Sequence, residues 1–99
     1  MNISSKLNPD RPKIIIGEKE YEVNDSIGTV LKFEELVGEL DGAEGMAKAI
    51  TVALGEKAVK DIDVMSLSLA NFKVIIVAIL AAMQDIEYEE AEKRFQDKA

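Results

Sequence analysis

The sequence contains no cysteine, no histidine and no tryptophan, and aromatic residues make up only 5% of its 99 residues. Without cysteine there is no thiolate nucleophile, no disulfide framework and no cysteine-based zinc site. Without histidine the chain also lacks an imidazole base and the commonest metal ligand. We therefore expect a protein that is not an enzyme and that needs neither a metal nor another cofactor.

Basic residues and long apolar runs are also scarce. Twelve lysines and arginines stand against 19 aspartates and glutamates, and the net charge of -7 repels phosphate backbones, so we expect no nucleic-acid partner. The longest apolar run, Val74–Met83, is about half of what a membrane-spanning helix needs. Residues 1–12 lack the apolar segment of a signal peptide. We expect a cytoplasmic protein with no membrane partner.

The length is sufficient for one small domain. Residues 1–12 are polar and contain both prolines of the chain, which predicts a flexible N-terminal arm. Residues 13–99 carry the periodic apolar patterns and are predicted to form a single globular domain.

Residues 13–24 predict a β-hairpin, because apolar residues alternate with polar ones on both sides of a glycine. Two registers remain open. One pairs Ile14 with Val23, and the other, which needs a two-residue turn at Gly17-Glu18, pairs Ile14 with Tyr21. A two-stranded hairpin is not stable alone in water, so its apolar face is expected to pack on helices.

Apolar spacing predicts helices over the rest of the domain. The three main ones are expected at 27–40, 43–54 and 69–83, with a short C-terminal helix at 87–96 and one helical turn at 56–61. The helix at 69–83 is apolar almost all round, as is typical of a central helix; its β-branched cluster leaves a buried strand as the alternative. The predicted fold class is α+β, mostly α: an N-terminal β-hairpin packed on a small bundle of three main helices plus a short C-terminal helix.

The core is expected to combine one face of the hairpin with the apolar faces of the helices. Its predicted members are Ile14, Ile16, Tyr21, Val23, Leu31, Val37, Ile50, Leu54, Phe72, Ile75, Ile76, Ile79 and Leu80. We interpret Met46, Met65 and Met83 as core residues rather than as an adaptable partner surface. Gly28 and Gly38 lie within a predicted helix, where close packing or adaptability to a partner would explain them.

Asp25-Ser26-Ile27 is similar to the motif at which acyl carrier proteins attach phosphopantetheine to a serine at a helix N-terminus. Serine also caps helices very often, and a hairpin precedes the motif where carrier proteins have a long helix. We interpret Ser26 as a helix cap and keep an acyl-carrier-like protein modified at Ser26 as an alternative. Glu35 and Glu39 share a helix face at a spacing found in helical metal sites, but we interpret them as a solvated face.

The order of the predicted elements resembles that of a known family. The hairpin has the form Ile14-x-Ile-Gly-x-Lys-x-Tyr-x-Val23, and a helix and a glycine-punctuated second helix follow it. Leu67-Ser-Leu69 then leads into the Ala/Ile-rich helix, and a charged tail helix ends the pattern. Over residues 13–95 the chain resembles the small tail assembly chaperones of long-tailed bacteriophages and of prophages in Gram-positive bacteria.

The resemblance implies a non-enzymatic assembly factor that binds the tape measure protein and recruits subunits of the tail tube, the major tail protein. It also implies a protein that works in the bacterial host and is absent from the mature virion. No binding motif of the family is available to transfer to single residues. The alternative is a small acidic adaptor or regulator that binds a protein partner outside any phage.

The tail helix is the predicted protein-binding element. Tyr88 and Phe95 are aromatic, and aromatic residues are favoured as interface anchors. With the neighbouring acidic residues Glu89 and Glu92 they make up the predicted binding site. The alternative is that both rings dock the tail helix onto its own domain.

Acidic residues are concentrated in two zones, residues 25–45 and 85–99, which would steer basic stretches of a partner. We expect the partner to bind as a helix in a groove, with apolar anchors supplying affinity. We also expect weak homo-oligomers, because a hydrophobic content of 47% in so short a chain leaves apolar surface exposed.

Overall fold

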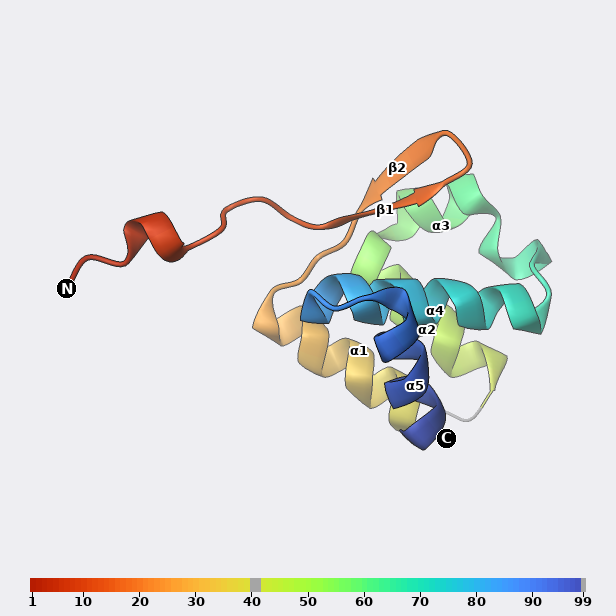
Figure 1. Cartoon of the computed structure of the whole chain (residues 1–99). Helices are drawn as coiled ribbons and strands as arrows, with labels where there is room; N and C mark the ends of the chain where they lie inside the picture. The colour runs from red at the N-terminus through yellow and green to blue at the C-terminus, as the bar shows by residue number, and fades with distance from the viewer. Residues whose placement is uncertain (40–41, 99) are drawn as a thin grey trace.

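The computed structural model describes residues 1–39 and 42–98, without the side chains of residues 39, 97 and 98. Figure 1 shows a hairpin above a group of helices, with the N-terminal arm extending away from them. The elements in chain order are η1 (Ser4–Lys6), β1 (Lys13–Ile16), β2 (Lys19–Glu22), α1 (Ile27–Glu39), α2 (Ala43–Leu54), α3 (Glu56–Ile62), η2 (Val64–Ser66), α4 (Leu69–Gln84) and α5 (Tyr88–Lys98). This is the predicted α+β, mostly α fold.

The two strands form an antiparallel hairpin in which Ile14 pairs with Tyr21 and Ile16 with Lys19. The register with a two-residue turn is therefore the one adopted. Gly17 is the first central residue of that turn and has φ +65°, a left-handed conformation that glycine adopts at little cost. Beyond the strands, the Val23 N–H donates to the Pro12 carbonyl at 2.8 Å and extends the ladder by one pair.

Helix α4 lies at the centre of the domain, and α2, α5 and β1 all pack against it. Its N-terminus is capped by the Ser68 hydroxyl, which accepts the Asn71 N–H at 3.1 Å. At its other end Asp85 adopts a left-handed conformation, and the Ile86 N–H donates to the Ala81 carbonyl at 3.1 Å, as in a Schellman motif. The alternative of a buried strand over 69–83 is therefore wrong.

The helices around α4 follow the predicted ranges closely. Helix α2 has the predicted bounds and ends at Gly55, whose φ of +90° is not helical and separates α2 from α3. The helical turn predicted at 56–61 is the seven-residue helix α3. The predicted C-terminal end of the first helix falls on residues 40 and 41, which lie outside the described residues.

The predicted core is largely confirmed. Eight predicted members are buried: Ile14, Val23, Ile50, Phe72, Ile75, Ile76, Ile79 and Leu80. Three more are partly buried and pack against them: Tyr21, Val37 and Leu54. Met46 is also buried, and Met83 packs against the core. The Asn24 N–H donates to the Ala53 carbonyl at 2.9 Å, which holds the end of the hairpin on α2.

Three predicted core residues are wrong. Leu31 is 62% exposed because α1 packs on α2 through Phe33 and Val37, on the opposite side of the helix. Ile16 is 37% exposed because it adjoins the turn, at the end of the hairpin that extends beyond the helices (Figure 1). Met65 is 78% exposed in the 3-10 turn η2, where the chain turns away from the core before α4.

Close packing does not explain the glycines of α1. A Cβ atom added at Gly28 or at Gly38 would meet no neighbouring atom within 4 Å, so neither residue allows a close approach by another element. The interpretation as packing glycines is wrong, because this part of the helix surface faces solvent.

Residues 1–12 carry three exposed apolar side chains, Met1, Ile3 and Leu7, around η1. In the described part of the chain no single helix is long and apolar enough to cross a membrane. Helix α4 and residues Tyr88–Gln96 meet that criterion only when they are taken together, and the chain bends by 112° between them.

We expect Ile76→Ala to lower the free energy of unfolding by about 2–5 kcal/mol, because Ile76 is fully buried in α4 and its truncation leaves a cavity. The matched variant Val74→Ala, on the exposed side of the same helix, should change it by less than about 0.5 kcal/mol. Urea denaturation followed by circular dichroism measures both. Equal effects would contradict the central position of α4.

We expect Gly38→Ala to raise the free energy of unfolding by about 0.5–1 kcal/mol, because alanine is the better helix former and its methyl group meets no neighbour. Gly17→Ala is the opposing control, since φ +65° strains any residue with a Cβ atom, and should lower stability. The same denaturation experiment compares them, and a destabilised Gly38→Ala variant would argue against a regular helix at this position.

Candidate functional site

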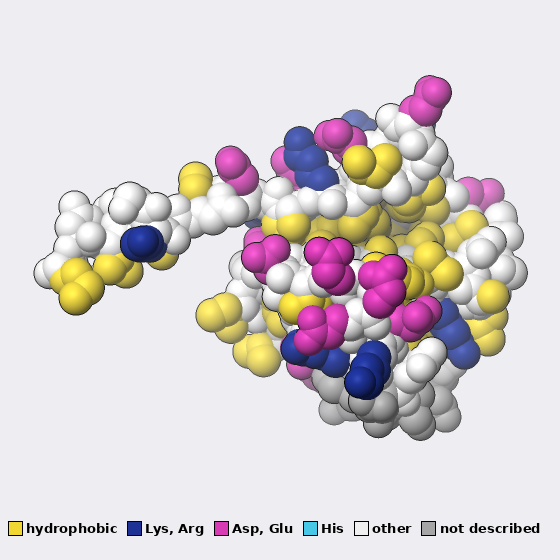
Figure 2. Space-filling model, viewed as in Figure 1, with side chains coloured by type: hydrophobic (Ala, Val, Ile, Leu, Met, Phe, Trp, Pro, Cys, Tyr) yellow, Lys and Arg dark blue, Asp and Glu magenta, His cyan; other side chains and the backbone are white. Residues whose placement is uncertain are grey.

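An open groove of about 420 Å³ separates β1 from the C-terminal half of α4. One wall comes from the strand and the floor comes from the helix, and the chain between α4 and α5 closes one side. The lining residues are Pro12, Lys13, Ile14, Ile15, Ala78, Ala81, Ala82, Asp85, Ile86 and Tyr88. Figure 2 shows apolar side chains in this hollow, between the hairpin and a row of acidic side chains.

The floor of the groove is formed by small side chains on one face of α4. Ala78, Ala81 and Ala82 recur three and four residues apart on that face, whereas the large side chains of Ile79 and Leu80 in the same part of the helix are buried in the core. Residues at this spacing share one face of a helix. Methyl groups alone cover that face, so the helix surface is recessed where β1 passes over it. The groove is not among the features predicted from the sequence, although the alanine spacing is a signal that indicates it.

Asp85 lines the groove, and three further carboxylates adjoin the lining residues Ile86 and Tyr88 in the chain or in α5. We call these four exposed residues the acidic rim: Asp85, Glu87, Glu89 and Glu92. The left-handed turn at Asp85 ends α4 and brings the start of α5 to this position. Removal of water around Tyr88 raises the pKa of its hydroxyl, and the negative charges of Glu92 and Glu89 raise it further. Both carboxylates therefore lie close to a ring that lines the groove.

The predicted site residues of the tail helix thus fall into two groups. Tyr88 lines the groove, and Glu89 and Glu92 lie close enough for their charges to act on its hydroxyl. Phe95 lies further along α5 and packs against the core beside the fully buried Ala91. Tyr88 also contacts the core, so both rings help to hold α5 on the domain.

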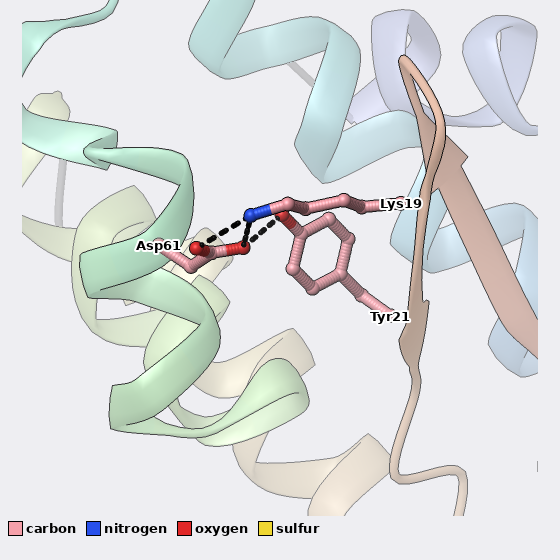
Figure 3. Close-up of polar contacts among 3 residues, drawn as sticks. All are labelled: Lys19, Tyr21 and Asp61. Carbon is pink, nitrogen blue, oxygen red and sulfur yellow. Dashed lines mark hydrogen bonds and ion pairs between the residues drawn. The ribbon is translucent and has the colours of Figure 1, made fainter.

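On the far side of the hairpin, three side chains connect β2 to α3 (Figure 3). The Lys19 Nζ atom lies 3.0 Å from Asp61 Oδ1, and the Tyr21 hydroxyl donates to Asp61 Oδ2 at 2.5 Å. We call this cluster the hairpin latch. It joins residues about 40 positions apart in the sequence and holds β2 against the helical part of the domain.

The latch keeps its three groups in their ordinary states at neutral pH. Hydrogen bonds from Tyr21 and Lys19 lower the pKa of Asp61, and the same hydrogen bonds raise the pKa values of Tyr21 and Lys19. Asp61 therefore loses its contribution to the stability of the fold as the pH falls through its lowered pKa, below about 4. Lys19 and Tyr21 lose their contributions to stability as the pH rises above about 10.

Ser26 lies at the N-terminus of α1, where its hydroxyl accepts the Thr29 N–H at 3.3 Å and donates to the Thr29 Oγ1 atom at 2.9 Å. This geometry is that of a helix cap. Among the described side chains there is no group of three or more carboxylates that could hold a metal ion. The side chain of Glu39, one member of the Glu35–Glu39 pair, lies outside that set.

No protein-family model, no curated protein and no solved structure matches this chain. An open groove with an apolar floor and a carboxylate at its side is suited to binding a segment of another protein.

We expect Asp61→Asn to lower the pKa of Tyr21 towards the ordinary tyrosine value of about 10, because the substitution removes the carboxylate that accepts the hydrogen bond of the hydroxyl, and with it the negative charge that opposes ionisation. The Tyr88→Phe background removes the only other tyrosine, so ultraviolet absorbance of tyrosinate then reports Tyr21 alone. Asp63→Asn in the same background is the control and should leave the titration unchanged. An unchanged Tyr21 titration in Asp61→Asn would show that the latch does not form in solution.

Proposed function

We propose that this chain is a tail assembly chaperone of a long-tailed bacteriophage or prophage, a non-enzymatic factor that binds the tape measure protein and recruits subunits of the tail tube. In this role it acts in the bacterial host and is absent from the mature virion. The order of hairpin, helices and charged tail helix supports the resemblance on which the proposal rests.

The groove and its acidic rim are the observation that carries the proposal. A chaperone of this kind has to cover apolar stretches of a long client without a catalytic step. The groove offers the alanine floor for apolar contacts, and Asp85 places a carboxylate beside it. Segments that combine apolar and basic residues are the matching clients. The same groove suits a small acidic adaptor outside any phage, and the identity of the client separates the two functions.

Co-expression with the tape measure protein tests the proposal directly. The full chain should keep that protein in the supernatant after centrifugation and should co-purify with it together with tail tube subunits. A tape measure protein that stays insoluble and does not co-purify with the chain would contradict the proposed function. Tail-tube and tape-measure genes on either side of the gene would support it independently.

We expect Asp85→Asn to weaken binding of the tape measure protein about two- to fivefold, because exposed ion pairs contribute up to about 1 kcal/mol each. Asp63→Asn is a matched control, since Asp63 also ends a helix in a left-handed conformation but does not line the groove. Asparagine tolerates that conformation, so both variants should fold normally. Titration at low and high salt should show the difference between them shrink as salt increases. Equal binding of the two variants would argue against a role for the rim.

A further inference from the structure

One edge of β1 faces away from β2, and the register of the hairpin determines which residues have their N–H and C=O groups on that free edge. In an antiparallel ladder, residues on one strand alternate between bonding to the partner strand and pointing their N–H and C=O groups to the other side. Ile16, next to the two-residue turn, bonds to β2, and so does Ile14. The Val23 to Pro12 hydrogen bond keeps the same phase. The backbone groups of Lys13 and Ile15 therefore point to the free edge.

The groove lies on this free edge. Its strand wall contains Lys13 and Ile15 together with Ile14, and none of the residues of β2 line it. Figure 1 shows β1 on the side of the hairpin nearer α4 and α5. The groove thus combines two elements that a strand-binding site needs: unpaired backbone donors and acceptors along one side, and an apolar floor below them for side chains.

The shape of the floor favours an extended occupant. Side chains of a bound strand alternate between the two faces of the extended sheet, so every second side chain would point down towards the alanines. The methyl groups of Ala78 and Ala82 leave room for those side chains. Asp85 lines the same space, and its negative charge and that of the neighbouring rim carboxylates match basic residues of the occupant.

We propose that the groove binds an extended segment of a client protein by strand addition to the free edge of β1, with alternating apolar and basic residues in that segment. The proposal rests on the client-binding function above and specifies its mode. It replaces the helix-in-groove mode expected from the sequence.

The probe for this mode is a synthetic octapeptide with blocked ends in which lysine and valine alternate, added to the full chain labelled with ¹⁵N. Amide exchange at Lys13 and Ile15 should slow about tenfold or more at saturation, because new hydrogen bonds protect these groups. The amides of Ile14 and Ile16 are internal controls. They already bond to β2 and should change little.

Backbone methylation of the peptide gives a second, independent readout. In an extended peptide, the N–H groups of the lysines and of the valines point to opposite edges. Methylating the nitrogens of one residue type should weaken binding about tenfold or more, whereas methylating the other type should leave it nearly unchanged. A peptide of the same composition with valines at helical spacing should bind weakly.

Variants of α4 locate the binding. Ala82→Gln fills part of the floor and should weaken binding of the alternating peptide, whereas Ala70→Gln, exposed near the other end of the helix, should not. Unchanged amide protection in the α4 core of both variants confirms that they fold. Equal binding by the two variants would overturn the groove as the site.

Other outcomes separate this inference from the proposed function. Equal binding of the two methylated peptides without protection at Ile15, or tighter binding of the helical-spacing peptide, would overturn strand addition. Failure of every peptide to bind while the tape measure protein still co-purifies would also overturn it, and would leave the chaperone function in place. Protection at Ile15 without co-purification of the tape measure protein would support strand addition at the groove and would contradict the proposed function as a tail assembly chaperone.

Discussion

The burial of α4 is the constraint on which the rest of the structure depends. A helix that is apolar almost all round cannot remain in water, so other elements must cover most of its surface. Helix α2, helix α5 and the hairpin each cover one side. The coverage is incomplete: Leu69 and Val74 are 50% and 51% exposed, and Ala78 and Ala82 on the groove face are partly exposed. The groove is therefore one of the places where the domain leaves its central helix uncovered.

The sequence predicted those features of the fold that depend on local signals. The N-cap at Ser68 and the glycine at Gly55 set helix ends through their own backbone and side-chain chemistry, and both ends lie where they were expected. Local signals do not predict whether Leu31 or Phe33 of α1 is buried. Both belong to the wide apolar arc of α1, and only the position of α2 decides which one is buried. Apolar spacing carries no information about that position.

The candidate site likewise contains residues that local sequence signals indicate and residues that only the fold brings together. Aromatic and acidic residues in the tail helix indicated Tyr88, Glu89 and Glu92, of which Tyr88 lines the groove with the two carboxylates close to its ring. The strand wall was missed because residues 13–15 and 78–88 meet only after the chain has folded. The predicted anchor Phe95 packs against the core. Its spacing from Tyr88 fits both an interface with a partner and the docking of α5 on its own domain, so the sequence alone does not distinguish the two.

The free edge of β1 is short. Pro12 bounds it on one side, since its nitrogen carries no proton and its carbonyl already bonds to Val23, and the turn at Gly17 bounds it on the other. Two residues with free backbone groups form few hydrogen bonds, so a single copy would hold a client segment weakly and release it quickly. A long client would then be retained by the number of copies along its length rather than by the affinity of any one of them.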